Sequence, residues 1–198
     1  STSWSGRPDS WNNSRTQPLT KVRAYDMPSF RDPIKSGLNE YYGKLKESVE
    51  GLTAEELLWQ PSPDSNHILW TVWHMARVAD RWANSTVLGN GELWTRNGWV
   101  AKLGMPEDRY GRGETPAQVR DFPSVDIELV LEYYDEAHAS VLAMIDALEQ
   151  SDLDRDVYAE YRDESLNIGW ILGHILSEES QHLGQVAYIR GIQRGFNG

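Results

Sequence analysis

Four long stretches of the chain repeat apolar residues at three- and four-residue spacing, which is the period of an amphipathic helix. Each such helix has to bury its apolar face against a neighbour, so four of them predict an all-α fold, a four-helix bundle. The loop between the second and third helices (89–124) is long, so these two helices need not be antiparallel neighbours. No convincing strand pattern appears, and the predicted helices are residues 32–51, 66–88, 125–148 and 167–194.

Local signals divide the rest of the chain. Thr53, with Glu56 three residues later, is a capping box that opens a short helical turn. Pro116 occupies the favoured first position of a short helix within the long loop. Residues 1–30 show no clear period, and we expect an N-terminal arm that packs on the body or on a partner subunit, with disorder as the alternative. Residues 31–198 form the predicted bundle domain.

The composition narrows the partners and the ligands. A net charge of −11 repels phosphate backbones, so we expect no nucleic acid partner. There is no 18-residue apolar run and no signal pattern, which predicts no membrane association and favours a cytoplasmic location. The chain has no cysteine, so a bound metal would be held by nitrogen and oxygen. Nine tryptophans and nine tyrosines indicate a lined cavity or a dimer face, without distinguishing the two.

The last predicted helix carries metal-binding groups at a repeated spacing, His174-x3-Glu178-x3-His182. Residues four apart point the same way from a helix and differ by about 6 Å in height, so an adjacent pair can bind one ion. The two histidines differ by about 12 Å in height, which is too far for both to share the ion comfortably. One adjacent pair therefore supplies two ligands, and His74, on one stripe of the second helix with Trp70, is the natural third.

These residues also have interpretations that need no metal. A histidine on an apolar helix face is more often a hydrogen-bonded core residue than a ligand, and Glu178 could be a solvated partner of its neighbours. Against this, Glu178 follows the inward series Ile171, His174 and Ile175. A buried carboxylate needs a cation or several hydrogen-bond donors. The joint pattern favours a metal site.

A weak internal repeat links the second and last helices. Trp70 precedes His74 by four residues, and Trp170 precedes His174 by four residues. Two helix pairs of related sequence predict a pseudo-twofold bundle in which these two histidines are rough counterparts. No role is assigned to the other two histidines outside the spaced run, His67 and His138.

Five stretches, taken together and in order, carry a resemblance to a known family. They are Gly51 to Pro61, Asn66 to Trp82 around His74, Glu92 to Trp99, Leu103 to Pro106, and His174 to Gly191. With these residues the chain resembles the DinB-like superfamily, the DinB/maleylpyruvate isomerase-like four-helix bundle metalloproteins, over roughly residues 32–195. The resemblance implies an up-down-down-up bundle that is often dimeric, so we expect a homodimer.

The resemblance also implies one metal ion held by His74, Glu178 and His182. The commoner family pattern has a histidine where this chain has Glu178, although some relatives carry a glutamate in a similar run. Two imidazoles and a carboxylate suit a divalent metal ion, for which zinc is favoured and nickel and iron(II) are alternatives. The side chains expected beside the ligands or in the adjoining pocket are His174, Trp70, Trp73 and Arg77.

Characterised members of the family include thiol-dependent transferases and isomerases that use low-molecular-weight thiols. The resemblance therefore implies a metal-dependent S-transferase or isomerase with a small-molecule substrate and such a thiol. One alternative is a metal-dependent hydrolase, for which Glu179 and Asp80 are nominal general bases. The other is a non-catalytic metal- or small-ligand-binding protein, because a fold does not fix a function.

Two further groups of side chains have both a functional and a structural interpretation. Arg77 and Arg81 could bind a carboxylate of the substrate, or they could form a solvated helix flank. Four tryptophans either line a pocket above the ion or serve as core and loop packing: Trp70, Trp73, Trp94 and Trp99.

Overall fold

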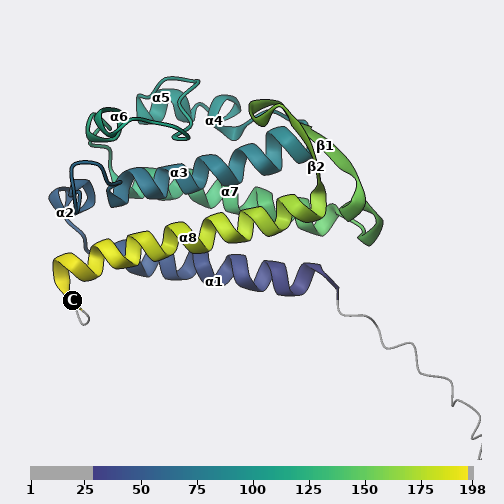
Figure 1. Ribbon diagram of the computed structural model, residues 1–198, viewed down its shortest axis with the longest axis horizontal. Coiled ribbons are helices and arrows are strands. Elements are labelled where there is room, and N and C mark those ends of the chain that lie inside the picture. The colour runs from purple at the N-terminus through teal and green to yellow at the C-terminus, as the bar shows by residue number, and fades with distance from the viewer. Residues whose placement is uncertain (1–28, 196–198) are drawn as a thin grey trace, which may run out of the picture.

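The computed structural model describes residues 29–195 and is built mainly of helices (Figure 1). The predicted arm, residues 1–30, lies outside this range apart from Ser29 and Phe30. No helix within the described range is both long and apolar enough to cross a bilayer. Four long helices form the body, close to their predicted positions: α1 (Arg31–Val49), α3 (Ile68–Asp80), α7 (Ile127–Ala147) and α8 (Ile168–Arg194).

The helices are arranged up-down-down-up, as predicted (Figure 1). Lys35 near the start of α1 pairs with Asp146 near the end of α7 at 2.6 Å, so these two helices are antiparallel. Arg190 near the end of α8 donates to the carbonyl of Ser48 at the end of α1, so α1 and α8 are parallel. α3 packs against both α7 and α8. The all-α four-helix bundle is therefore confirmed.

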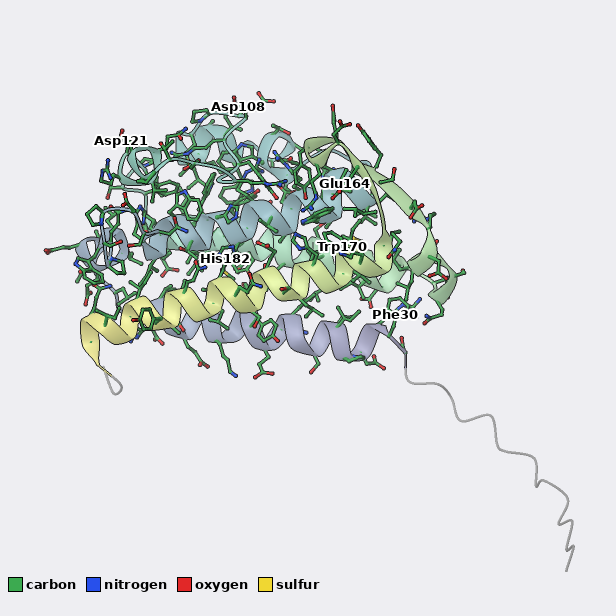
Figure 2. The ribbon with its side chains drawn as sticks, viewed as in Figure 1. Phe30, Asp108, Asp121, Glu164, Trp170 and His182 are labelled. Atoms are coloured by element: carbon green, nitrogen blue, oxygen red, sulfur yellow. The ribbon has the colours of Figure 1, made fainter. Side chains whose placement is uncertain are left out.

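Every residue of α3 is buried, including its polar ones. α7 and α8 cover one side of this helix, and the long connection that precedes α7 covers the other (Figures 1 and 2). The side chains of Arg77 and Asp80 have no exposed surface, and that of Arg81 is 16% exposed. The interpretation of Arg77 as part of a solvated flank is therefore wrong.

The predicted second helix continues past α3 in a different form. A π-helical stretch, η1 (Arg81–Val87), follows without a break. π-Helical turns frequently occur at functional sites because they change which face a side chain occupies. Trp82, the second residue of this stretch, packs against the ring of His174, with 5.3 Å between ring centroids.

The long connection after η1 is folded onto the bundle through Asp80. This carboxylate accepts hydrogen bonds from the backbone N–H groups of Leu93 (2.8 Å) and Trp94 (2.9 Å) and from the Tyr133 hydroxyl (2.8 Å). Trp94 and Trp99 are buried, so both serve as packing. The short helices are α2 (Ala54–Leu58), α4 (Leu93–Arg96), α5 (Trp99–Leu103) and α6 (Pro116–Arg120). Two of these, α2 with its capping box and α6 with Pro116 at its start, were predicted.

A small antiparallel hairpin precedes α8, where the sequence predicted no strand. Its strands are β1 (Asp156–Ala159) and β2 (Glu164–Asn167), with Val157 opposite Leu166. Burial alternates along both strands, but each has only four residues and only Ala159 is fully buried, so the alternation is too short and too weak to identify a strand from the sequence. Short 3-10 turns lie before the hairpin and at its tip, η2 (Gln150–Asp154) and η3 (Glu160–Arg162). Figure 2 shows Glu164 of the hairpin at the same end of the molecule as Trp170.

Candidate metal centre

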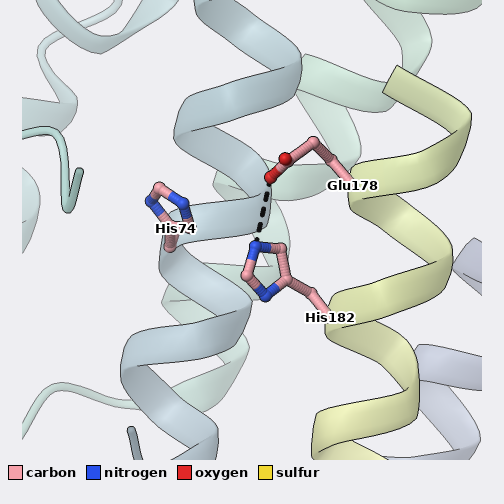
Figure 3. Close-up of side chains that lie close together, drawn as sticks. All are labelled: His74, Glu178 and His182. Atoms are coloured by element: carbon pink, nitrogen blue, oxygen red, sulfur yellow. Dashed lines mark hydrogen bonds and ion pairs between the residues drawn. The ribbon is translucent and has the colours of Figure 1, made fainter. Parts of the chain in front are cut away.

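Three side chains with metal-binding groups meet between α3 and α8 (Figure 3). His74 comes from α3, and Glu178 and His182 come from consecutive turns of α8. One ligand atom from each side chain lies within 4.8 Å of the other two. His182 Nε2 is 3.2 Å from Glu178 Oε2, and the two imidazole rings lie edge to face with 5.2 Å between centroids. The structure thus brings together the three residues predicted as ligands.

Both imidazoles have a partner for the ring nitrogen that faces away from this cluster. His74 Nδ1 donates to the carbonyl of Tyr110 at 2.9 Å, which leaves Nε2 with its lone pair. His182 Nδ1 lies 3.2 Å from Gln185 Oε1, an oxygen that can accept its proton and so free Nε2. Histidines that bind metals usually have such a partner, because it fixes the tautomer and the ring orientation.

The protonation of the cluster also favours cation binding. Burial is the main reason that the pKa of His74 falls to about 4, and the nearby His182 lowers it further. The hydrogen bond with His182 keeps the pKa of Glu178 below its ordinary value. Near neutral pH His74 is therefore neutral and Glu178 ionised, which are the forms that bind a metal ion.

The donor set fits a divalent ion of the zinc type. Bonds of about 2.0–2.1 Å in a tetrahedron place neighbouring ligand atoms roughly 3.3 Å apart. The 3.2 Å between His182 Nε2 and Glu178 Oε2 matches this spacing. Small side-chain rotations would bring His74 to the same spacing, since the three ligand atoms of the cluster lie within 4.8 Å of one another. Three protein ligands, with a further position for water or substrate, are the usual pattern of catalytic zinc sites.

The loop that supports His74 depends on Gly111. The backbone there has φ +94°, and a Cβ atom would lie 2.5 Å from His74 Nδ1 and 3.1 Å from Trp70 Cζ2. Only glycine lets the chain come this close to the imidazole while the neighbouring Tyr110 carbonyl accepts its proton.

We expect Gly111→Ala to weaken metal binding by about 10- to 100-fold, the usual cost of losing an outer partner of a ligand. The measurement is a competition titration with a chelator. Gly113→Ala is the matched control, because Gly113 also has a positive φ (+75°) but nothing within 4 Å of its Cβ position. Both variants should lose about 1–3 kcal/mol of stability from backbone strain. Equal metal affinity in the two variants would contradict the proposed role of the loop.

A cavity of about 230 Å³ adjoins the cluster. Its walls come from α3, the loop after α5, the hairpin and α8. The lining residues are His74, Val78, Tyr110, Arg112, Tyr161, Arg162, His174 and Glu178.

Comparison with known protein families identifies the family to which this chain belongs. The model of the DinB superfamily matches residues 38–186. The chain belongs to the DinB superfamily. It is also similar to a crystal structure described as a conserved protein of locus from Enterococcus faecalis, with a TM-score of 0.74 and 18% sequence identity, over 83% of this chain and 96% of that chain. At this identity the likeness shows the fold alone. No curated protein matches the chain.

The internal repeat of this DinB-superfamily chain is visible in its ring contacts. Trp70 stacks on His74 with 4.9 Å between centroids, and Trp170 stacks on His174 with 4.7 Å. Each helix start is capped in the same way: the His67 and Asn167 side chains accept from the backbone N–H of Trp70 and Trp170.

The two halves of the DinB bundle differ where the ligands lie. One hundred residues before Glu178 and His182, the chain has Val78 and Trp82. His74 therefore faces His182 across the helix pair, whereas its counterpart His174 faces Trp82. Of the two positions that the repeat relates, only the one formed by His74 with Glu178 and His182 carries a full ligand set among the described residues. His174 Nε2 lies 3.8 Å from Glu178 Oε1 and lines the cavity.

The other candidate residues of this DinB protein lie away from the cavity. Trp73 and Arg77 are fully buried and do not line it. The two nominal general bases are buried as well: Asp80 anchors the loop, and Glu179 accepts a hydrogen bond from the Tyr134 hydroxyl. Burial raises the pKa of Glu179 to about 8.

Sequence reasoning missed four lining residues of the DinB cavity. Tyr110 and Arg112 belong to the loop after α5, and Tyr161 and Arg162 belong to the tip of the hairpin. The glycines on either side of Arg112 were a signal that the backbone adopts an unusual conformation there. The hairpin offered no comparable signal.

Proposed function

We propose that this DinB-superfamily protein is a divalent-metal-dependent enzyme, an S-transferase or isomerase that uses a low-molecular-weight thiol. The observation that carries the proposal is the convergence of His74, Glu178 and His182 at the wall of a cavity. Zinc suits this donor set best, with nickel and iron(II) as alternatives. When bound, the ion supplies positive charge that favours the thiolate form of a thiol.

The chain's own residues fit such a cosubstrate. The protein has no cysteine, so the reacting sulfur has to come from a small molecule. The Tyr110 and Tyr161 rings pack together with 5.5 Å between centroids and shield one side of the cavity from water. His174 is the remaining imidazole in the cavity wall, stacked on Trp170, and holds its ring toward Glu178.

Of the general bases that hydrolysis would need, the two carboxylates considered from the sequence do not reach the cavity, whereas the His174 imidazole does. Hydrolysis needs a general base close to the attacked water. Asp80 and Glu179, the two candidates, are buried and hydrogen-bonded elsewhere, and neither lines the cavity. A binding protein without catalytic activity remains the competing outcome of the test.

Cobalt substitution tests the proposal. We expect 2-mercaptoethanol to produce a sulfur-to-cobalt charge-transfer band in the cobalt-loaded protein, because a site for a thiol lets sulfur occupy the free position. Ethylene glycol, the oxygen analogue, is the control and should not produce the band. An unchanged spectrum with 2-mercaptoethanol and with 3-mercaptopropionate would instead favour a hydrolase or a binding protein.

A further inference from the structure

The cavity beside the candidate ligands contains two guanidinium groups. Arg112 comes from the loop after α5 and Arg162 from the tip of the hairpin. Both lie close enough to His174 for their charges to act on it: burial is the main cause of its lowered pKa, and the two arginines contribute. The cavity therefore has a basic side as well as the cluster formed by α3 and α8.

Arg112 has no partner among residues 29–195. It forms no hydrogen bond, salt bridge or ring contact there. Nearby Glu114 is already engaged, because it pairs with Arg109 at 2.8 Å and accepts from Trp70 Nε1 at 2.9 Å. Arg112 is exposed, and no acceptor among residues 29–195 takes any of its five N–H donors, so within the described part of the chain they can face a ligand.

Arg162 is held in place from two sides. Its Nε pairs with Glu164 Oε1 at 2.5 Å, and its guanidinium lies 5.3 Å from the centre of the Trp170 ring. Arg162 also interacts with the neighbouring Tyr161 side chain, so its guanidinium is fixed at the cavity wall. A planar guanidinium matches a carboxylate in geometry and in charge.

With a divalent ion bound, the side chains that line the cavity would carry a net positive charge. Glu178 is the one acidic side chain among the described lining residues, and it belongs to the candidate ligands. A divalent ion would more than neutralise it, and since Glu164 balances Arg162 from outside the lining, Arg112 would have no described anion to balance it. The cavity is thus suited to an anion although the protein as a whole is acidic.

We infer that the cavity binds a small substrate through a carboxylate, with Arg112 and Arg162 as the binding residues and the reacting end directed at His74, Glu178 and His182. The inference deepens the proposed function and rests on it for the identity of the reacting end. The volume of about 230 Å³ limits the ligand to a small acid, since it equals the space of about eight water molecules. Arg77 and Arg81, for which the sequence left open either carboxylate binding or a solvated helix flank, do not line this cavity.

The test compares butyrate with its neutral analogue butyramide, using the full-length protein as purified and after chelator treatment. Binding is followed by calorimetry and by tryptophan fluorescence, for which the partly exposed Trp170 beside Arg162 is a local reporter. We expect butyrate to bind at least about tenfold more tightly than butyramide with and without metal, as for hydrogen bonds to charged groups. Arg112→Gln should remove about tenfold of the butyrate affinity, and Arg112→Lys should retain part of it.

Arg96→Gln is the matched control, since Arg96 is exposed and does not line the cavity. It should bind butyrate within about twofold of the wild type. The inference is overturned if Arg112→Gln binds butyrate as the wild type does, or if the preference for butyrate disappears on chelation, which would assign it to the metal alone. If the preference persists but elemental analysis shows that the protein takes up no divalent metal even after loading, the proposed function fails while the inference stands.

Discussion

Replacing His182 by alanine is expected to reduce metal affinity by more than about 100-fold, which exceeds the cost of losing an outer partner of a ligand. His182 Nε2 and Glu178 Oε2 are the closest pair of candidate ligand atoms, 3.2 Å apart. Without the imidazole, an ion would retain one nitrogen from α3 and one carboxylate. His74→Ala should have a similar effect, because it removes the ligand that links α3 to α8. The measurement is metal per chain by elemental analysis after dialysis against a chelator.

Two matched variants make this result specific. His138→Gln removes a histidine that is hydrogen-bonded to Asn39 and stacked on Tyr42, outside the cluster, and should keep full metal content. Glu178→His restores the commoner family pattern and should keep the metal, whereas Glu178→Ala should lose it. Full metal content in both His74→Ala and His182→Ala would place the site elsewhere.

The sequence predicted the helices and the ligand cluster for one physical reason. Helical periodicity is a local property, so the 3.6-residue repeat indicated both the buried stripes and the direction of Glu178 and His182 from α8. Spacing left open which adjacent pair on α8 would face His74, and family position favoured the later pair. The later pair does face His74: His182 lies against His74, whereas His174 lies against Trp82.

The features of the fold and of the cavity that could not be predicted from the sequence depend on tertiary contacts. Arg77 and Asp80 are three residues apart, which is also the spacing of a solvated ion pair. Only the loop that docks over α3 makes them buried. The lining residues Arg112 and Arg162 reach the cavity from a loop and a hairpin that carry no helical period, so spacing could not place them beside α8.

Arg77→Met is expected to destabilise the protein by about 3–5 kcal/mol, the usual cost of removing one partner from a buried charge network. Arg77 Nη2 pairs with Glu92 Oε2 at 2.5 Å, and Nη1 lies 3.7 Å from Asp80 Oδ2 and donates to the Tyr133 hydroxyl. Methionine fills similar space but leaves the buried Asp80 without its cation, whereas Glu92 keeps Arg81 at 2.5 Å. Urea unfolding measures the change. Lys44→Met, which removes an exposed i,i+4 partner of Glu40, should cost less than about 0.5 kcal/mol.

Arg77→Met should also weaken metal binding, because Arg77 connects the core to the candidate metal centre. Its Nε donates to the carbonyl of Arg109 at 3.2 Å, and the carbonyl of the next residue, Tyr110, accepts from His74 Nδ1. A loosened loop would leave His74 without its fixed tautomer, so affinity should fall by about 10-fold or more under conditions where the variant is folded. Adding Glu92→Gln should recover neither the stability nor the metal affinity, because Glu92 keeps Arg81 as a partner at 2.5 Å in the absence of Arg77. Recovery of both would mean that Arg77 acts on the ion only through global stability.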